Sequence, residues 1–416
     1  MRFEGKNSNA FNYISSKYVF RFNVVTNFYE FAVKRKKNKN LKWIRYNDRH
    51  KNSILLELMQ EHIEVATDKF NIFVESEACS PDYDPFNEYF ENLKPYNKKK
   101  EKDYIDLFAK TINTDDSKRF KKTLERFLVG TLDCLLKRNS VNDVCMVFQS
   151  KQGRGKTRWM RTLLPKVFQD EYLYEGSIDT RNKDHNIYLS QYWFIHLDEL
   201  EALKGNAIES IKSYITRGKI NERKAYGRYS TYFERRASFL GSVNADKFLS
   251  DMTGNRRWLV FRVKSIDYMH GLDSDRLWAQ VFALHAKGYR HWFNPEEIKE
   301  LNEENEKFRE VSLEEEMIIR FFEFPKWKTS KGEYTSGSEA LQKIIFNVPG
   351  FNNKLTSYRI NKALSKHSEL KKMKGKVQRY YLEYMGADLE VDSPSVTFNS
   401  GKKSSKSIDE DDDLPF

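Results

Sequence analysis

The chain has 416 residues, and 72 Lys or Arg against 60 Asp or Glu give it a formal net charge of +12. Such a basic chain favours a polyanionic partner, with nucleic acid ahead of membrane, although a generally lysine-rich proteome would give the same excess. Its 30 Phe and 23 Tyr exclude a disordered protein, and its length predicts two or three domains. The sequence shows no signal peptide and no apolar run of about 18 residues, which predicts a soluble, cytoplasmic protein.

The N-terminal region, residues 1–95, is expected to mix strands and helices. Short apolar runs alternate with polar residues between positions 18 and 46, and a basic turn at 34–40 separates two of these runs. This pattern predicts strands joined by a lysine-rich hairpin. Prolines between positions 81 and 95 predict a loop or linker, and the helically spaced apolar residues of 103–138 predict a helical region at 96–140.

In the segment 141–293, short apolar strands alternate with helices. The expected strands are 144–148, 192–197, 237–243 and 258–263. The expected helices are 157–164, 201–216, 246–252 and 275–287. Strand–helix alternation of this kind predicts an α/β fold with a mostly parallel sheet covered by helices.

The C-terminal part divides by composition. A highly charged connector is expected at 294–312. Residues 313–385 then predict a small winged-helix-like domain, in which two helices are followed by two short segments that form the wing. After position 386 the chain is rich in Ser, Lys and Asp and lacks periodicity, which predicts a flexible tail with an acidic tip.

A phosphate-binding loop, or P-loop, lies between the first expected strand of 141–293 and its helix. Gly155-Lys156-Thr157 matches the second half of the pattern G-x-x-x-x-G-K-[ST], while Ser150 stands where the first glycine is usual. Glycines let backbone N–H groups curl round phosphates, the lysine balances the β- and γ-phosphate charge, and the threonine hydroxyl ligates Mg²⁺. The expected nucleotide-binding residues are Ser150, Gly153, Arg154, Gly155, Lys156 and Thr157. A GKT triplet is common by chance, but its place between a strand and a helix makes ATP and Mg²⁺ the expected cofactors.

An acidic pair and an amide end two later strands. Asp198 is expected to hold Mg²⁺ through water, and Glu199 is expected to polarise the attacking water. The same pair could instead cap the helix that begins near position 200. Asn244 is expected to contact the γ-phosphate and the attacking water, although an asparagine at a strand end is otherwise an ordinary turn residue.

Two arginines, Arg256 and Arg257, follow a tight turn. In a ring of subunits they could supply positive charge to the γ-phosphate of a neighbouring subunit, which makes them candidate catalytic residues. Surface basic residues without a catalytic role are the alternative.

The order strand, P-loop, Asp-Glu, Asn and Arg-Arg resembles the compact AAA+ core of superfamily 3 helicases. A closer resemblance is to the virulence-associated protein E family of phage and mobile-element ATPases, and it is carried by the segments 215–228, 235–244 and 254–257. The resemblance implies a homo-oligomeric, ring-forming ATPase, often partnered with a primase, that acts in replication of a phage or integrated element. No primase active site is recognisable in the first 140 residues.

Basic residues with an interleaved tyrosine lie between the acidic pair and the amide. They are Arg217, Lys219, Arg223, Lys224, Tyr226 and Arg228. The resemblance to superfamily 3 rings implies a basic hairpin at this place, in the pore. Lys and Arg can grip phosphates and Tyr can stack on a base, so single-stranded or forked DNA is the expected partner. Some of these arginines could instead reach the nucleotide or a neighbouring subunit.

The chain ends in Asp409-Glu-Asp-Asp-Asp-Leu-Pro-Phe416, which resembles the acidic tip of bacterial single-stranded-DNA-binding proteins. The resemblance implies that Leu414, Pro415 and Phe416 dock into a pocket on host replication proteins. A solubilising tail, or one that folds back on the protein's own DNA groove, is the alternative. The predicted function is an ATP-driven DNA helicase or initiator ring, and its rival is a nucleic-acid-binding interference factor that uses nucleotide only as a switch.

Overall fold

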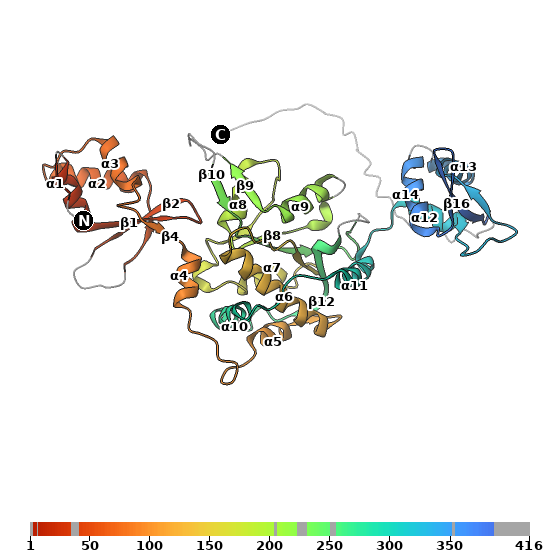
Figure 1. The fold of residues 1–416 in the computed structure, drawn as a ribbon, viewed down its shortest axis with the longest axis horizontal. Coiled ribbons are helices and arrows are strands. Elements are labelled where there is room, and N and C mark those ends of the chain that lie inside the picture. The colour runs from red at the N-terminus through yellow and green to blue at the C-terminus, as the bar shows by residue number, and fades with distance from the viewer. Residues whose placement is uncertain are drawn as a thin grey trace, which may run out of the picture. The chain divides into compact units, whose positions relative to one another are not determined.

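The computed structural model describes residues 3–5, 7–34, 41–203, 206–222, 231–249, 255–351 and 354–386. The chain forms two compact units, Met1–Glu310 and Val311–Phe416 (Figure 1). Within the described ranges, no helix is both long and apolar enough to cross a membrane.

A six-stranded sheet forms the centre of the first unit. Its strands, in spatial order, are β5 (Ile112–Thr114), β12 (Trp258–Ile266), β6 (Cys145–Gln149), β11 (Ser238–Val243), β8 (Phe194–Leu197) and β7 (Leu173–Glu175). All neighbours are parallel except β5, which runs antiparallel to β12. The expected α/β fold with a mostly parallel sheet is therefore confirmed.

Helices cover both faces of this sheet, because successive strand residues point to opposite sides. In β6, Met146 and Phe148 join the core on one face, whereas Cys145 and Val147 join the core on the other. The first face is covered by α5 (Tyr104–Lys110), α6 (Ser117–Leu136), α7 (Lys156–Thr162) and α10 (Ser274–Ala286), and the second by α8 (Lys183–Gln191) and α9 (Asn206–Thr216) (Figure 1). Because β6, β11 and β8 are parallel, the loops that follow them meet at one edge of the sheet.

The segment 103–138, which the sequence predicts to be helical, contains a strand. After α5 comes β5, and Asp116 then caps α6 by accepting a hydrogen bond from the N–H of Arg119 at 2.9 Å. In β5 the alternate residues Ile112 and Thr114 are buried, which is the period of a strand. The prediction of one helical region is wrong here, because a strand of 3 residues is too short for its periodicity to be recognised.

The charged segment 294–312, expected as a connector, is instead packed into the first unit. It contains α11 (Pro295–Asn305). The buried Asn305 amide donates to the carbonyl of Asn255 at 2.8 Å and to that of Trp258 at 2.9 Å. The helix therefore ties down the start of β12, and only its outer face carries the charges that suggest a connector.

The helix expected at 246–252 is absent from the part that the structure describes, residues 246–249. The N–H groups of Phe248 and Leu249 donate to the carbonyl of Phe308, at 2.9 and 3.1 Å. These backbone donors are thus satisfied by another segment of the chain and not by a helix of their own. Residues 250–252 lie outside the described ranges.

The N-terminal region forms a second, four-stranded sheet with its own helices. The strands, in spatial order, are β3 (Ile44–Arg45), β2 (Phe28–Val33), β1 (Tyr18–Asn23) and β4 (Asp82–Tyr83), and the helices are α1 (Ser8–Lys17), α2 (Asp48–Gln60), α3 (Thr67–Glu75) and α4 (Pro85–Asn92). The hairpin β1–β2 turns at residues 24–27, where the Asn23 side chain accepts from the N–H groups of Val25 and Thr26. β2 also pairs antiparallel with β3, so the basic segment 34–40 joins two paired strands, as the sequence predicts.

The proline-rich segment 81–95 is more ordered than the expected loop or linker. Pro85 is the first residue of α4, where its fixed φ suits the first helical turn and its missing N–H costs nothing. The Asp84 side chain caps the helix by accepting from the N–H groups of Phe86 and Asn87. Proline at this position starts a helix and does not interrupt one.

The second unit has its own hydrophobic core. Its elements are α12 (Leu313–Phe321), β13 (Phe322–Glu323), β14 (Glu333–Thr335), α13 (Gly337–Asn347), α14 (Ser357–His367), β15 (Lys371–Lys374) and β16 (Val377–Tyr384). The antiparallel pair β15–β16 follows α14, at the place where the sequence predicts a wing. Residues 387–416, which include the acidic tip, lie outside the described ranges.

Candidate functional site

The P-loop lies between β6 and α7, and its glycines have conformations that other residues rarely adopt. Gly153 and Gly155 have φ angles of +80° and +84°. Ser150, which replaces the first glycine of the usual pattern, has no positive φ, and its N–H donates to the carbonyl of Val243 at 3.1 Å. A serine therefore fits this position without backbone strain.

The Lys156 ammonium connects the P-loop with the end of β11. Its Nζ donates to the carbonyl of Ser150 at 2.8 Å and to Oδ1 of Asn244 at 2.9 Å. Burial lowers the pKa of Lys156, and the nearby carboxylates of Asp198 and Glu201 oppose this shift. A phosphate oxygen is a stronger partner for an ammonium than these neutral acceptors, so the side chain can exchange them for phosphate.

The acidic pair directly follows β8. The hydroxyl of Ser242, on β11, donates to Oδ1 of Asp198, which also accepts from the N–H of Glu199 at 3.0 Å. Glu199 has a φ of +51° and begins a short 3₁₀ turn, yet its side chain makes no capping hydrogen bond. The alternative that Glu199 serves as a helix cap is therefore wrong, and its carboxylate remains exposed.

Two side chains that support these residues carry no sequence motif. Glu201, in the 3₁₀ turn Leu200–Ala202, accepts from the N–H of Asn244 at 3.0 Å. Ser242, as described above, holds Asp198. Glu201 and Asn244 are 43 positions apart, and Ser242 and Asp198 are 44 apart, so only the pairing of β8 with β11 brings them together.

These side chains surround one cavity of about 350 Å³. It is lined by residues 152–158 together with Asp198, Glu199, Ser242, Asn244 and Tyr268. Of the predicted nucleotide-binding residues, only Ser150 is not part of this lining. The described part of the chain has no group of three or more His, Cys, Asp or Glu that could hold a metal ion by itself. Thr157 and Asp198 fit a Mg²⁺ ion that takes its other oxygen ligands from phosphates and water.

Arg256 and Arg257 lie outside this cavity. They belong to the 3₁₀ turn Asn255–Arg257 that precedes β12, where Arg256 is exposed and Arg257 is half-buried. The Asn305 contact described above fixes this turn. The preceding residues 250–254 lie outside the described ranges, so the structure leaves the expected tight turn untested.

The basic segment after α9 contains a hairpin. β9 (Lys219–Glu222) pairs with the antiparallel strand β10 (Thr231–Glu234), and Lys219 is exposed. Arg217 precedes the hairpin, and its guanidinium donates to Oδ1 of Asn186. The other predicted DNA-binding residues lie outside the described ranges, and they are Arg223, Lys224, Tyr226 and Arg228.

Arg235, in the segment that carries the family resemblance, has a structural role. Its buried guanidinium donates to the carbonyls of Ile215, Arg217 and Ala237, at 2.9, 2.7 and 2.8 Å. These contacts join the end of α9 to the strands β10 and β11. The sequence does not distinguish this arginine from the DNA-binding candidates, because all of them belong to one basic segment.

The next residue, Arg236, links the central sheet to the N-terminal region. Its guanidinium donates to the carbonyl of Leu135 and pairs with the Asp84 carboxylate at 2.7 Å. Since Asp84 also caps α4, the ion pair fixes the start of that helix.

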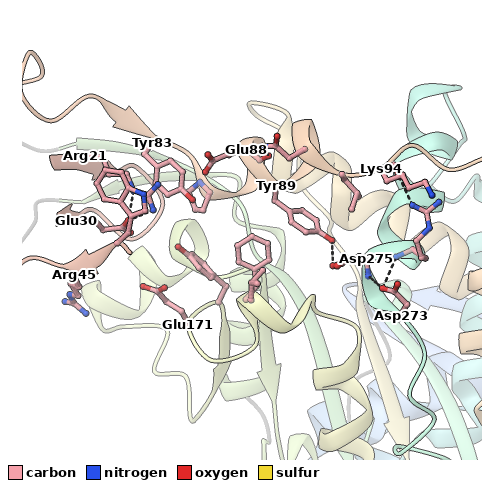
Figure 2. Close-up of a pocket in the computed structure, with 18 residues that line it drawn as sticks. Arg21, Glu30, Arg45, Tyr83, Glu88, Tyr89, Lys94, Glu171, Asp273 and Asp275 are labelled. Carbon is pink, nitrogen blue, oxygen red and sulfur yellow. Dashed lines mark hydrogen bonds and ion pairs between the residues drawn. The ribbon is translucent and has the colours of Figure 1, made fainter. Parts of the chain in front are cut away.

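A larger cavity of about 760 Å³ lies between the N-terminal sheet, α4 and the start of α10 (Figure 2). Arg21 pairs with Glu30 at 2.6 Å and lies 3.3 Å from the centre of the Tyr83 ring, and Tyr89 donates to Asp275 at 2.8 Å. None of the predicted site residues lines it. Because many of its polar groups already bind one another, its size alone does not make it the functional site.

Comparison with known proteins identifies one domain. Residues 93–310, more than half of the chain, match the virulence-associated protein E-like domain. Two solved structures are similar, both described as apo forms of the NrS-1 C-terminal region. The first is 14% identical with a TM-score of 0.48 and covers 91% of this chain and 100% of that one, and the second is 13% identical with a TM-score of 0.43 and covers 90% and 98%. Among curated proteins no sequence matches. The domain match identifies the P-loop cavity as that of an NTPase, which binds nucleotide.

Proposed function

The chain belongs to the virulence-associated protein E-like family, and we propose that it is an ATP-dependent DNA helicase or replication-initiator ATPase of a phage or mobile genetic element. The observation that carries the proposal is the contact of Lys156 with Asn244 at the cavity that Asp198 and Glu199 also line. An ammonium, two carboxylates and an amide around one space are the groups that phosphoanhydride hydrolysis uses. The strand order, with β11 between the P-loop strand β6 and β8, supports an AAA+ arrangement like that of superfamily 3 helicases.

In the proposed complex, the phosphates of ATP replace the present partners of Lys156. The ammonium leaves the Ser150 carbonyl and balances the β- and γ-phosphates, while the Thr157 hydroxyl and the Asp198 carboxylate hold Mg²⁺. The Ser242 hydroxyl keeps the Asp198 carboxylate in one orientation.

When Lys156 moves to the phosphates, the side chain of Asn244 gains new hydrogen-bond partners. Its Oδ1 atom, now occupied by Lys156, becomes available to the attacking water and its amide to the γ-phosphate. Its backbone stays in place through the hydrogen bond to Glu201. Glu199 polarises the attacking water. Asn244 thus responds to the presence of nucleotide, which is the behaviour expected of a sensor.

The two arginines are proposed to act on a neighbouring subunit. Arg256 and Arg257 do not line the cavity of their own chain, and Arg256 is exposed. A homo-oligomeric ring would bring such a turn to the γ-phosphate of the adjacent subunit, where a guanidinium stabilises the charge of the transition state. Hydrolysis would then depend on assembly.

Single-stranded or forked DNA is the proposed substrate of the motor. The hairpin β9–β10 carries the exposed Lys219, and Tyr232 on β10 is 77% exposed, so a cation and an aromatic ring are both accessible. Backbone phosphates and bases are the partners that such a combination fits. Arg217, whose guanidinium is held by Asn186, is proposed to support the hairpin.

Further partners are proposed from the C-terminal unit, from the tail and from the family. The helices and the β15–β16 hairpin of residues 311–386 support a winged-helix module. We propose that the tip Leu414–Phe416 docks on host replication proteins, that a primase acts with the ring, and that the protein works in the cytoplasm.

Phosphate release from ATP, measured with and without single-stranded DNA, tests the proposed function. DNA is expected to accelerate the wild-type protein, and Glu199→Gln is expected to lower kcat about 100-fold while ATP still binds, because only the base for water is lost. Glu171→Gln, which removes a carboxylate from the other cavity, is the matched control and should keep the wild-type rate.

Three outcomes would contradict the proposal. A Glu199→Gln rate equal to wild type would remove the assigned role of that residue. Nucleotide-dependent DNA binding without turnover would favour the interference factor. Strand displacement that proceeds equally well without ATP would exclude a helicase.

A further inference from the structure

Tyr268 enters the P-loop cavity from the side opposite the carboxylates. It lies just beyond the end of β12 at Ile266, and β12 borders the P-loop strand β6 on one side. The strands β11 and β8, which carry Asn244, Asp198 and Glu199 at their ends, lie on the other side of β6. A nucleotide whose γ-phosphate reaches those groups therefore extends its nucleoside toward β12.

The Tyr268 ring rests directly on the P-loop. A Cβ atom added to Gly155 would lie 2.3 Å from Cδ1 of Tyr268, so position 155 needs glycine for contact as well as for its φ of +84°. The guanidinium carbon of Arg158 lies 5.3 Å from the centre of the same ring. Tyr268 is half-buried and lines the cavity, so part of the ring is accessible to a ligand.

The described lining of the cavity gives little means of recognising the edge of a base. Apart from Gly155, Lys156, Thr157 and the groups at the ends of β8 and β11, it consists of Gln152, Gly153, Arg154, Arg158 and Tyr268. Gln152 is the amide of this group, and it is exposed. A site with no buried hydrogen-bonding partner for a substrate group discriminates weakly against substrates that differ in that group.

We propose that Tyr268 is the platform on which the base of the nucleotide stacks, and that the site accepts ATP and GTP alike. An aromatic face binds any base. Arg158 donates to the Tyr268 hydroxyl at 3.5 Å and so helps to hold the ring in place. This inference rests on the proposed NTPase function and assigns the substrate class of the same site.

Tyr268 could alternatively act only by holding Gly155, and the two roles differ in the ligands that they affect. A stacking platform affects ligands that contain a base, whereas a support for the P-loop affects every ligand that contains phosphates. Inorganic tripolyphosphate, which has the phosphates and no base, separates them.

The experiment compares Tyr268→Ala and Tyr268→Phe with wild type for MgATP, MgGTP and tripolyphosphate. Tyr268→Ala is expected to raise the KM and Kd for ATP roughly tenfold, as loss of a stacking contact does, with kcat changed less than about twofold. Tyr268→Phe should retain wild-type KM, and tripolyphosphate should bind all three proteins equally. Met269→Ala is the matched control, because Met269 is the next residue, is 77% exposed and does not line the cavity.

Two results would overturn the inference. Equal weakening of tripolyphosphate and ATP by Tyr268→Ala would make Tyr268 a support for the P-loop. A wild-type preference for ATP over GTP above about 50-fold would show that the edge of the base is recognised. Because Kd is measured by calorimetry without turnover, a wild-type protein that binds ATP and does not hydrolyse it would refute the proposed function while leaving this inference standing.

Discussion

Lys156 and Arg235 are both buried basic side chains that donate to backbone carbonyls, but their surroundings differ. Lys156 borders a cavity of about 350 Å³ whose lining includes carboxylates. The Arg235 guanidinium instead donates to four backbone carbonyls of its own chain. Burial and hydrogen bonding alone therefore do not distinguish a ligand-binding cation from a structural one. The two are distinguished by whether a cavity for a ligand lies beside the cation.

The largest effect is expected from Lys156→Met. It should lower kcat for ATP hydrolysis about 10²- to 10³-fold, because the phosphates lose their ammonium partner. The free energy of unfolding should change by less than about 1 kcal/mol. The substitution removes hydrogen bonds, but it also removes the cost of burying a charged ammonium, and the two effects oppose each other. Phosphate release and urea unfolding measure the two quantities. A large loss of stability would show that Lys156 is structural as well, and would end the contrast with Arg235.

The converse is expected for Arg235→Met. The substitution removes the hydrogen bonds to the carbonyls of Ile215, Arg217 and Ala237, and a longer one to that of Asn142 at 3.5 Å. At about 1 kcal/mol for each of the three shorter bonds, the free energy of unfolding should fall by about 3 kcal/mol. The rate of ATP hydrolysis per folded molecule should not change. Arg236→Met is the matched control, because this side chain is partly exposed and fewer buried groups lose a partner. Equal losses of stability in urea unfolding for the two variants would contradict the special role of Arg235.

The smallest effect concerns pH. Burial lowers the pKa of Lys156 below its ordinary value of 10.5, and bound phosphates should raise this pKa again. The bound form then has the higher pKa, so the contribution of the ammonium to ATP affinity is complete below the pKa of the free protein and is lost as the pH rises through it.

Calorimetric Kd values for MgATP should therefore increase at alkaline pH, before 10.5 is reached. Lys156→Arg is the control, since a guanidinium stays charged over this range and its affinity should not follow the same curve. A wild-type affinity that is independent of pH up to 10.5 would show that the site does not shift the pKa of Lys156.

The parts of the site that the sequence predicts are those with a local signal. The P-loop occupies contiguous positions between a strand and a helix, and the acidic pair and Asn244 each end an apolar strand. Because parallel strands end at the same edge of a sheet, strand prediction alone brings these residues together. Glu201 and Tyr268 have no such signal. The contact of Glu201 with Asn244 and the place of Tyr268 in the cavity depend on which strands are neighbours.

The same limit explains the errors in the fold. β5 has 3 residues, too few to show a period of two, and its pairing with the end of β12 is not encoded nearby. α11 buries Leu301 and Asn305, which are four positions apart and therefore on one face of the helix. Its other face carries the charges, so composition suggests a connector where the structure has a packed helix.

The Asn305 contact also bears on how such proteins exchange parts during evolution. A recombination joint at residue 293, where the charged segment begins, would remove α11 and leave the carbonyls of Asn255 and Trp258 without their donor. The turn that carries Arg256 would then lose its support. A joint just after residue 310 keeps α11 and its hydrogen bonds to the turn, so a new C-terminal unit can replace the old one without disturbing the arginines. A joint that keeps the arginine turn intact must therefore lie after α11, beyond the boundary that the charge pattern suggests.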